Sequence, residues 1–558
     1  MRKLLTFMAL GVFSFAGLQA QKYNGYTLYS QQNGSTAILM DTNQTAIKTW
    51  SGLSSKTTYS AYLEPGGYLT RAATNTGNSF SGGPISGRVQ RHDYNGTLVW
   101  DYVYSTTNYC SHHDICPMPN GNVLLIAYER RTSTETSAMG GSSSIEMWPD
   151  KIVEIQPTGA TTGNVVWEWK SWDHLMQNAD ASKANYVTSL VDHPERLNIN
   201  YKQAKDWLHM NGVDYNPILD QIAFSSHNLN EWYIIDHSTT TAEAATSTGG
   251  NSGKGGDILY RWGNPAAYGA TGTAILNVTH DAHWIPEGVP NAGRLVGFNN
   301  KGVSASQSSV DQIVTPINGY TYNITAGQAY GPATYNDRHA CNGYSSNMGS
   351  SEQLPNGNML VCVATAGKIY EINAAGTALW TKSLTGGGSA QAHMYDSCYI
   401  FNTPPAIPTI TAAGTTLTAS SAATYQWYMN GVLISGANGM TYSPTTSGVY
   451  VVRITDANGC MYRYSTGYKY TKPNSLPETD FSHLVSIYPN PSSSILYIKH
   501  QQANGTAFLC SIYDQLGHLV KNAQTADVID VSGLANGYYT VKIAFGNGTA
   551  THKLLIQH

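Results

Sequence analysis

The sequence predicts an all-β protein made of several domains, and three observations support this prediction. Glycine and tyrosine are abundant, with 54 and 38 residues, which is typical of short strands joined by tight turns. Short apolar runs alternate with turn signals along most of the chain. With 558 residues and roughly 150 residues per domain as a guide, we expect three or four domains.

The charge balance excludes several classes of protein. Charged residues make up 12% of the chain and the formal net charge is −4. The basic surplus of a nucleic-acid-binding protein is therefore missing, and we expect no nucleic-acid partner. The chain lacks the Glu, Lys, Ala and Leu bias of a coiled coil. Its 41% of hydrophobic residues argues against intrinsic disorder.

Residues 1–20 form a predicted signal peptide. Arg2 and Lys3 precede an apolar stretch, and Ala20 is a small residue at the expected cleavage point. The alternative is a buried N-terminal helix. No later stretch reaches the roughly 18 apolar residues of a membrane helix. We therefore expect an exported protein with no membrane span.

Residues 21–402 contain two repeated elements that predict a β-propeller. One is a Pro-Asn-Gly-Asn turn before an apolar strand, at 119–126 and 355–362, with a degenerate copy at 293–298. The other is a strand that follows a glycine turn and reaches a tryptophan. A meander repeated many times with little helix is typical of a propeller, for which we expect six blades. A β-helix or stacked sandwiches are the alternatives. The tryptophans of the second element are Trp100, Trp167, Trp169, Trp262 and Trp380.

Histidine motifs precede the turns of this repeat, where a propeller places residues that face its central channel. SHHD (111–114) precedes the first Pro-Asn-Gly-Asn turn, and THDAH (279–283) precedes the degenerate copy. A third segment, DWLHMNGVDYN (206–216), is followed by a strand that leads to His227. A single histidine is more often structural than catalytic. The channel is nevertheless where we expect the chemistry.

Several of these motifs resemble the PAPS-independent arylsulfotransferases. They are H-H-D-x-x-x-x-P-N-G-N, V-V-W-E-W…W-D-H-L (165–175), D-W-x-H-x-N-x-V-D-Y-N and T-H-D-A, spread over about residues 90–395. The resemblance implies a six-bladed propeller that moves a sulfuryl group from a phenolic sulfate to another phenol through a sulfated histidine. It also implies aryl sulfates and phenols as partners and no cofactor.

Histidines can supply much of the chemistry that sulfuryl transfer requires. Imidazole is a nucleophile that is neutral near pH 7, sulfate oxygens need donors or cations, and the phenol oxygen needs a general acid or base. On the motif matches, His209 and His280 are the first catalytic candidates, followed by His113 and His339. Candidate substrate-binding residues are Asn211, His227 and His283.

The position of the nucleophile stays open. The family uses three separated histidines and an arginine, but GSSEQ (349–353), before the second Pro-Asn-Gly-Asn turn, holds no histidine. The candidates are His113, His280, His339 and His393, and sequence order alone does not choose among them. His113 and its neighbour His112 could instead organise the entry of a strand.

A metal centre is a further hypothesis for THDAH. His280, Asp281 and His283 could ligate zinc or calcium. Residues three apart in a strand point to opposite faces, however, so the two histidines would share an ion only at a turn. We therefore expect no metal.

Three functions compete at this point. The first is an exported sulfotransferase that acts on aryl sulfates and phenols. The second is a non-enzymatic surface propeller that binds a glycan or a protein. The third is another channel enzyme, such as a sulfatase-like hydrolase or a quinone- or metal-dependent oxidase. The first requires several histidines to converge in one channel, whereas the second allows them to be scattered.

Two smaller modules follow. Residues 403–475 resemble an immunoglobulin-like sandwich, with Trp427, an Asn430-Gly431 turn and a late apolar strand. Residues 480–558 form a predicted small β-sandwich. Its YPNP opening (488–491) and its G-x-Y-x-V-x-I strand (537–543) resemble the type IX secretion C-terminal sorting domain. That resemblance implies type IX machinery as a partner, with export to the cell surface or medium of a Gram-negative bacterium.

The chain has seven cysteines, and an exported protein can form disulfides. The odd number leaves at least one free thiol. Cys110 and Cys116 are close enough in sequence to pair across a loop.

Overall fold

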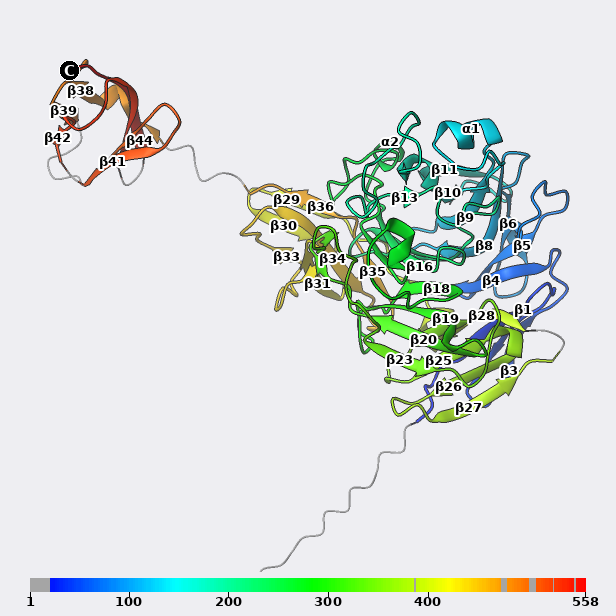
Figure 1. Cartoon of the computed structure of the whole chain (residues 1–558). Coiled ribbons are helices and arrows are strands. Elements are labelled where there is room, and N and C mark those ends of the chain that lie inside the picture. The colour runs from blue at the N-terminus through cyan, green and yellow to red at the C-terminus, as the bar shows by residue number, and fades with distance from the viewer. Residues whose placement is uncertain (1–20, 386–387, 473–478, 501–507, 525, 546–547) are drawn as a thin grey trace, which may run out of the picture. The chain divides into compact units, whose positions relative to one another are not determined.

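In the computed structural model, the described residues are 21–558 except 386–387, 473–478, 501–507, 525 and 546–547. The predicted signal peptide lies outside them. The described chain forms two compact units, and the second comprises residues 444–447 and 471–558. Strands dominate both units (Figure 1), which confirms the all-β prediction.

The described part of residues 26–395 contains six four-stranded antiparallel sheets, and we interpret each of them as one blade. From the innermost strand outward they are β28 (Ser389–Tyr395), β1 (Tyr26–Gln31), β2 (Ala37–Met40), β3 (Ala46–Trp50); β4 (Thr57–Glu64), β5 (Tyr68–Thr74), β6 (Gly87–His92), β7 (Leu98–Val103); β8 (Tyr109–Pro117), β9 (Val123–Glu129), β10 (Asp150–Pro157), β11 (Gly163–Lys170); β14 (Met210–Asn216), β15 (Gln221–Ser226), β16 (Glu231–Asp236), β17 (Tyr260–Trp262); β18 (Thr279–Trp284), β19 (Leu295–Ser304), β20 (Gln307–Ile313), β23 (Asp337–Ala340); and β24 (Ser350–Gln353), β25 (Met359–Val363), β26 (Lys368–Ile372), β27 (Ala378–Ser383).

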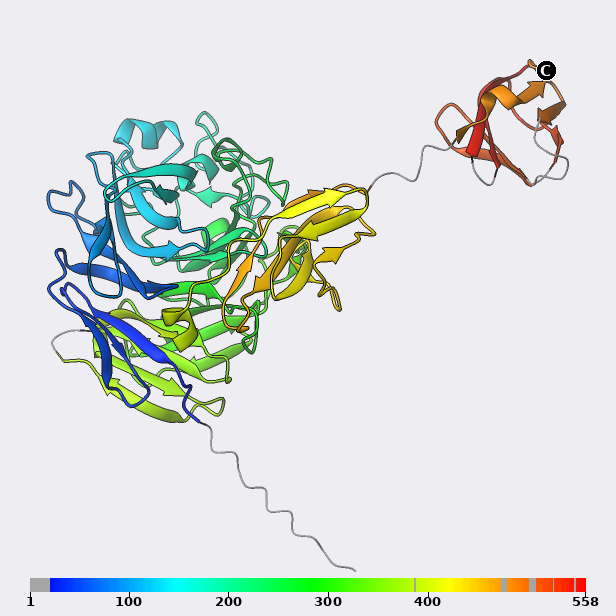
Figure 2. The same ribbon diagram turned by 180° about the vertical axis from the view of Figure 1, so that it is seen from behind.

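The inner strands close a ring. Strand β4 contacts β8, and contacts continue through β14, β18, β24 and β28 back to β4. The N-terminal strand β1 pairs with β28, so one sheet is built from both ends of this region (Figures 1 and 2). The two Pro-Asn-Gly-Asn turns connect an innermost strand to the second strand of its sheet. The predicted tryptophan-bearing strands are the outermost ones, and all of their tryptophans are buried.

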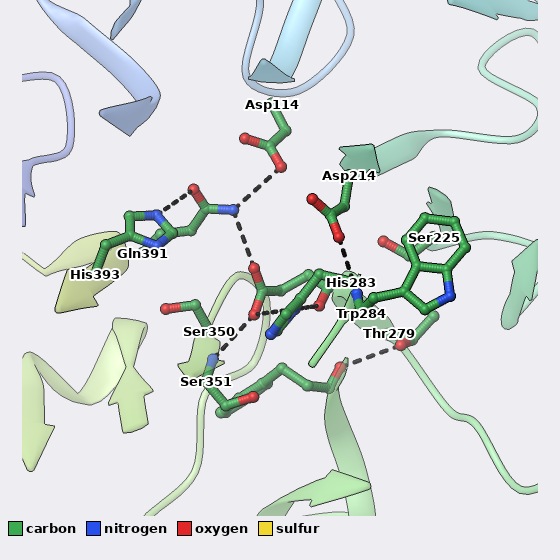
Figure 3. Close-up of polar contacts among 12 residues, drawn as sticks. Asp114, Asp214, Ser225, Thr279, His283, Trp284, Ser350, Ser351, Gln391 and His393 are labelled. Carbon is green, nitrogen blue, oxygen red and sulfur yellow. Dashed lines mark hydrogen bonds and ion pairs between the residues drawn. The ribbon is translucent and has the colours of Figure 1, made fainter. Parts of the chain in front are cut away.

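Hydrogen bonds between side chains and neighbouring backbones fasten the inner strands to one another. Four carboxyl groups each accept the backbone N–H of a residue on the next inner strand. Two tyrosine hydroxyls make the remaining two connections of the ring. Figure 3 shows the bond between Asp214 and Trp284. The bonds are Asp114 Oδ2 to Val213 N at 3.2 Å, Asp214 Oδ2 to Trp284 N at 2.9 Å, Asp281 Oδ2 to Ser351 N at 2.9 Å, Glu352 Oε2 to Met394 N at 2.7 Å, Tyr395 OH to Leu63 N at 2.9 Å and Tyr62 OH to Asp114 Oδ1 at 2.9 Å.

Burial makes ionisation of these carboxyl groups unfavourable. It raises the pKa of Asp114 to about 6 and that of Glu352 to about 8. A carboxyl whose pKa is higher in the folded than in the unfolded chain binds more protons when folded. Its contribution to stability is present at low pH and is lost as the pH rises toward the folded pKa.

We therefore expect Glu352→Gln to stabilise the protein at pH 8.5, by at least about 1 kcal/mol, and to have little effect at pH 5. Glutamine keeps an oxygen that can accept the Met394 N–H, but it carries no charge. Urea unfolding of both proteins at the two pH values measures the effect. If the two proteins differed in unfolding free energy by the same amount at both pH values, this account would be contradicted.

Short elements connect or flank the blades. The paired strands are β12 (Leu175–Met176) with β13 (Leu197–Asn198) and β21 (Ile317–Asn318) with β22 (Thr321–Tyr322). The helical segments are α1 (Ser133–Ala138), α2 (Thr241–Ala244), α3 (Ser397–Phe401), η1 (Ser171–His174), η2 (Pro265–Tyr268), η3 (Ala364–Ala366) and, in the second unit, η4 (Ser482–Leu484). No helix in the described chain is both long and apolar enough to cross a membrane.

Residues 410–470, which we call the middle module, form two sheets around the fully buried Trp427. The sheets are β29 (Ile410–Ala413), β30 (Thr416–Ala419), β33 (Thr441–Tyr442); and β32 (Val432–Leu433), β31 (Thr424–Met429), β34 (Gly448–Thr455), β35 (Tyr462–Tyr464), with β36 (Tyr468–Tyr470) on β34.

The middle module is attached to the propeller through Glu287, which follows strand β18. The Glu287 carboxylate pairs with Arg453 at 3.0 Å and accepts hydrogen bonds from the hydroxyls of Tyr464, at 2.8 Å, and Tyr428. A disulfide joins Cys398 in α3 to Cys460 in the module.

Cys110 and Cys116, which are close enough in sequence to pair, do not form a disulfide, because both thiols are free. The two residues lie on the same extended strand, β8. At about 3.3 Å per residue, they are far beyond the Cα separation that a disulfide spans.

The second unit contains two sheets with a common apolar core. Their strands are β37 (Thr479–Asp480), β44 (Gly548–Ile556), β43 (Gly537–Phe545), β40 (Leu509–Tyr513), β41 (Leu519–Gln524); and β38 (Val485–Tyr488), β39 (Ile495–His500), β42 (Val528–Asp530).

Candidate active site

Four histidines from three neighbouring sheets form a cluster: His113 lies in β8, His280 in β18, His209 directly before β14 and His227 directly after β15. The ring centroids of His113 and His209 are 4.5 Å apart, those of His209 and His227 are 5.0 Å apart, and those of His227 and His280 are 5.6 Å apart. The structure therefore brings His209 and His280, which the motifs singled out, into ring contact with the same third histidine.

Unusual backbone geometry occurs at three of these histidines, His113, His209 and His280. The pairing of β8 with β9 is irregular between Ser111 and Ile115, and that of β18 with β19 between His280 and His283. Bulges of this kind re-aim side chains. His113 and His209 also adopt left-handed φ values of 49° and 51°. Such conformations are unfavourable for most residues and gather at functional sites.

His209 is oriented by a carboxylate. Its Nδ1 lies 2.6 Å from Asp206 Oδ2, which also accepts a hydrogen bond from the Tyr128 hydroxyl at 3.1 Å. Burial alone would raise the pKa of Asp206, but the contacts with His209 outweigh it and lower the value. Asp206 is thus ionised, and the side chain of His209 remains 17% exposed. Its Nε2 forms no hydrogen bond within the described chain.

His113 is hydrogen-bonded to His112, which is in turn hydrogen-bonded to Asp150. Its Nδ1 lies 2.7 Å from Nδ1 of His112, and Nε2 of His112 lies 2.8 Å from Asp150 Oδ1. Asp150 Oδ2 in turn accepts the N–H of Met210 at 3.0 Å. Burial, reinforced by the neighbouring imidazoles, lowers the pKa of His113 well below its usual value. His113 is therefore neutral.

His280 has both ring nitrogens occupied. Its Nδ1–H donates to Asn300 Oδ1 at 2.7 Å, and its Nε2 accepts the N–H of Met348 at 3.1 Å. Burial lowers its pKa well below the usual value. His280 therefore lacks a free lone pair for attack in this arrangement, because Met348, which directly precedes the segment 349–353, uses it.

His227 stands at the rim of the cluster. Its Nδ1–H donates to Asn228 Oδ1 at 2.8 Å, and its half-buried ring leaves Nε2 without a hydrogen bond in the described residues. Burial, and then the neighbouring imidazole of His209, lower the pKa of His227. The exposed Lys202 donates from Nζ to the carbonyl of Asn228 at 2.7 Å, which places a cation beside this ring.

Other predicted residues lie elsewhere. His339 is on the outermost strand β23, where it contacts the Tyr370 hydroxyl at 3.1 Å. Asn211 braces two inner strands, donating to the Thr279 carbonyl at 2.8 Å and accepting from the Ser225 hydroxyl at 2.6 Å. These positions do not point to a role in the cluster, and we leave both residues out of the proposed site.

His283 and His393 also lie outside the histidine cluster. His283 bonds the carbonyl of Asp281 at 2.8 Å. The His393 ring packs on Tyr62 at 4.4 Å, and Figure 3 shows its contact with Gln391. Both line a separate cavity.

The sequence reasoning missed three supporting residues. Asp206 carried a signal, since it stands three residues before His209 in the D-W-x-H motif. Asp150 and Tyr128 carried no such signal. They lie on strands β10 and β9, far in the sequence from the histidine motif that contains His209. Among the described residues, no group of three His, Cys, Asp or Glu side chains is arranged to hold a metal ion.

Solved structures with a related arrangement share little sequence with the chain. A chain of the nidogen/laminin complex is 8% identical, with 67% of this chain and 98% of that chain covered and a TM-score of 0.34. A putative 6-phosphogluconolactonase from Bacteroides fragilis is 10% identical, with 67% and 99% covered and a TM-score of 0.33. Regucalcin, a calcium-binding protein from Agrobacterium tumefaciens, is 10% identical, with 61% and 85% covered and a TM-score of 0.28.

Two family models match the chain, and no curated protein does. The model described as secretion system C-terminal sorting domain matches residues 486–557. A domain of this kind indicates secretion or attachment at the cell surface. The model described as arylsulfotransferase (ASST) matches residues 77–392, more than half of the chain, and its range includes the whole histidine cluster. The chain therefore belongs to the arylsulfotransferase family, whose members are PAPS-independent aryl-sulfate sulfotransferases.

Proposed function

We propose that the histidine cluster transfers a sulfuryl group from an aryl sulfate to a phenol, with His209 as the nucleophile. The observation that carries this proposal is the 2.6 Å contact between His209 Nδ1 and Asp206, together with the unbonded Nε2 of a partly exposed ring. When Nε2 attacks sulfur, the imidazole gains positive charge. A carboxylate at Nδ1–H stabilises that charge as it develops.

The reaction has two balanced halves. In the first, the bond from His209 Nε2 to sulfur forms, the bond from sulfur to the donor oxygen breaks, and His227 gives its proton to the departing phenolate. In the second, the acceptor oxygen attacks sulfur, the nitrogen–sulfur bond breaks, and His227 takes the acceptor proton. His227 enters the first half as the imidazolium and leaves it neutral; its lowered pKa favours release of the proton to the phenolate, and the freed Nε2 lone pair then accepts the acceptor proton.

Burial distinguishes His209 from His113. The side chain of His113 is almost fully enclosed, at 1% exposure, and its Nδ1 is used in the relay to His112 and Asp150. A sulfuryl group reaches the rim residues His209 and His227 more readily. We assign His113 to supporting the ring of His209, and Lys202 to attracting the anionic donor toward the rim.

We also propose that the enzyme works outside the cell. The secretion sorting model at residues 486–557 and the predicted signal peptide at residues 1–20 support this location. The phenols and aryl sulfates that it encounters would then be extracellular.

A chromogenic aryl sulfate tests the reaction type. We expect release of the coloured phenol to increase when an acceptor phenol is added, because the acceptor regenerates His209. Parallel double-reciprocal lines are expected, since the first phenol leaves before the second phenol binds. Release that is indifferent to the acceptor would indicate a hydrolase instead, and no release from several aryl sulfates would indicate a binding protein.

A further inference from the structure

The loop between β5 and β6, residues 75–86, lies against the strand that carries His112 and His113. It belongs to a sheet that contributes none of the four clustered histidines. The carbonyl of Pro84 accepts the N–H of His113 at 3.0 Å, and Ile85 forms a β-bridge with His112. Strands β5 and β6 contact β8, as Figure 1 shows. A fourth sheet therefore takes part in building the site.

Aromatic packing holds this loop in place. Phe80 is buried, and its ring centroid lies 4.9 Å from that of Trp148 and 6.1 Å from that of Tyr128. The guanidinium of Arg130 covers the Phe80 ring at 5.0 Å and donates to the carbonyl of Ser79 at 3.3 Å. The loop is therefore anchored before the two glycines that follow Phe80, as well as after them.

These two glycines, Gly82 and Gly83, differ in what their positions require. A Cβ atom at Gly82 would come within 2.8 Å of the Tyr128 hydroxyl, so the close packing requires a glycine there. A Cβ atom at Gly83 would lie 3.6 Å from Cε1 of His209, which is an ordinary contact, and would meet no other atom within 4 Å beyond its chain neighbours. The φ of Gly83 is outside the left-handed region. Neither backbone conformation nor packing therefore requires a glycine at position 83.

The open space beside Gly83 adjoins the nitrogen that we assign to the attack on sulfur. Cε1 of His209 is bonded to both ring nitrogens, and Nδ1 is already used by Asp206. The rings of His113 and His227 contact the same imidazole, whereas the exposed Gly83 presents no side chain to it. An aryl sulfate that brings its sulfur to Nε2 can therefore extend along the Gly83 side of the ring.

We propose that Gly83 determines the size of the aryl group accepted at His209, and that the missing side chain suits aryl sulfates with two fused rings. This inference rests on the proposed function, because it assigns a substrate class to the same site. A side chain at position 83 would occupy the space that the second ring needs. Steric exclusion of this kind discriminates between substrates by about tenfold or more. The acceptor phenol attacks the same sulfur, so the same selection applies to it.

Two aryl sulfates of different size test the proposal on the full chain, with one acceptor phenol at a fixed concentration. They are 4-nitrophenyl sulfate, with one ring, and 4-methylumbelliferyl sulfate, with two fused rings. Each kcat/KM is divided by the wild-type value, which cancels the different leaving abilities of the two phenols. We expect Gly83→Leu to lower kcat/KM for the fused-ring sulfate at least about tenfold more than for the single-ring sulfate. Gly83→Ala should have a smaller effect in the same direction.

A second glycine provides the matched control. Gly533, in the second unit, also has a φ outside the left-handed region and open space around its Cβ position. Gly533→Leu adds the same side chain and should leave both kcat/KM values unchanged. Thermal unfolding of each variant verifies that it is folded. Equal losses for the two sulfates in Gly83→Leu, or no loss for either of them, would overturn the proposal.

Binding measurements separate this proposal from the proposed function. If the wild type transferred the sulfuryl group from neither sulfate, the proposed function would fail, and titration calorimetry with the same two sulfates would decide the role of Gly83. A loss of affinity in Gly83→Leu that is confined to the fused-ring sulfate would support that role. Affinities that Gly83→Leu leaves unchanged, or no binding of either sulfate to the wild type, would overturn it.

Discussion

A His209→Gly variant should lose sulfuryl transfer by a factor on the order of 10⁴ or more, the scale seen when a covalent nucleophile is removed, while the propeller stays folded. No sulfated peptide should form when the variant is incubated with an aryl sulfate alone. In the wild type, mass spectrometry of the quenched enzyme should find the sulfuryl group on the peptide that contains His209.

Glycine is the best replacement for two reasons. Residue 209 has a φ of 51°, which glycine adopts without strain, so the backbone of the site is preserved. Glycine also leaves a space next to Asp206 in which free imidazole can bind. We therefore expect added imidazole to restore part of the activity, which a merely structural role for His209 would not explain.

Two further variants complete this test. His193→Ala removes a partly exposed histidine outside the cluster and should leave the activity unchanged. Asp206→Asn keeps the shape of the partner but removes its charge, so it should slow transfer without abolishing the sulfated peptide. Retention by His209→Gly of more than about a tenth of the activity would remove His209 from the role of nucleophile.

The general architecture was predictable because its signals are local and repeated. A Pro-Asn-Gly-Asn turn sets one hairpin, and a glycine turn before a tryptophan strand sets the outer edge of a blade. The family resemblance then singled out His209 and His280, which the structure places near each other. Closure of the ring through β1 and β28 was implied by the propeller but had no motif of its own.

The residues that support the histidine cluster were not predictable in the same way. Asp150 and Tyr128 contact His112 through the pairing of strands within one sheet, and Met210 and Asp206 through the packing of that sheet against the next; sequence spacing records neither arrangement. The disulfide from Cys398 to Cys460 spans 62 residues and depends on where the middle module docks. His280 had a strong motif, yet its lone pair is used by the N–H of Met348, a contact that the motif does not reveal.

The second large effect concerns stability. Arg261 and Glu231, on neighbouring strands β17 and β16, form an ion pair in which both side chains are 0% exposed. Arg261 also donates to the carbonyls of Pro194, at 3.4 Å, and Arg196, at 2.8 Å. Arg261→Met should destabilise the protein by about 3–5 kcal/mol, because it leaves a buried carboxylate without its cation.

The double variant Arg261→Met/Glu231→Gln should recover a large share of this loss. Glutamine carries no charge, so the desolvation penalty of an unpaired carboxylate disappears, while its oxygen can still accept the hydrogen bond of the Tyr233 hydroxyl. Recovery should be incomplete, because the carbonyls of Pro194 and Arg196 still lack a donor. Urea unfolding measures the free energy of unfolding of both variants. The two values are compared on the condition that the dependence of that free energy on urea concentration is the same in both variants.

The pH dependence of the unfolding free energy of Arg261→Met identifies the cause of its destabilisation. Burial raises the pKa of Glu231 even with Arg261 present, and removing the guanidinium raises it further. A carboxyl with a raised pKa in the folded state loses its stability contribution as the pH rises. The deficit of Arg261→Met should therefore be larger at pH 8 than at pH 5, whereas that of the double variant should be the same at both. A deficit in the single variant that does not change with pH would mean that lost packing, and not an unpaired charge, destabilises it.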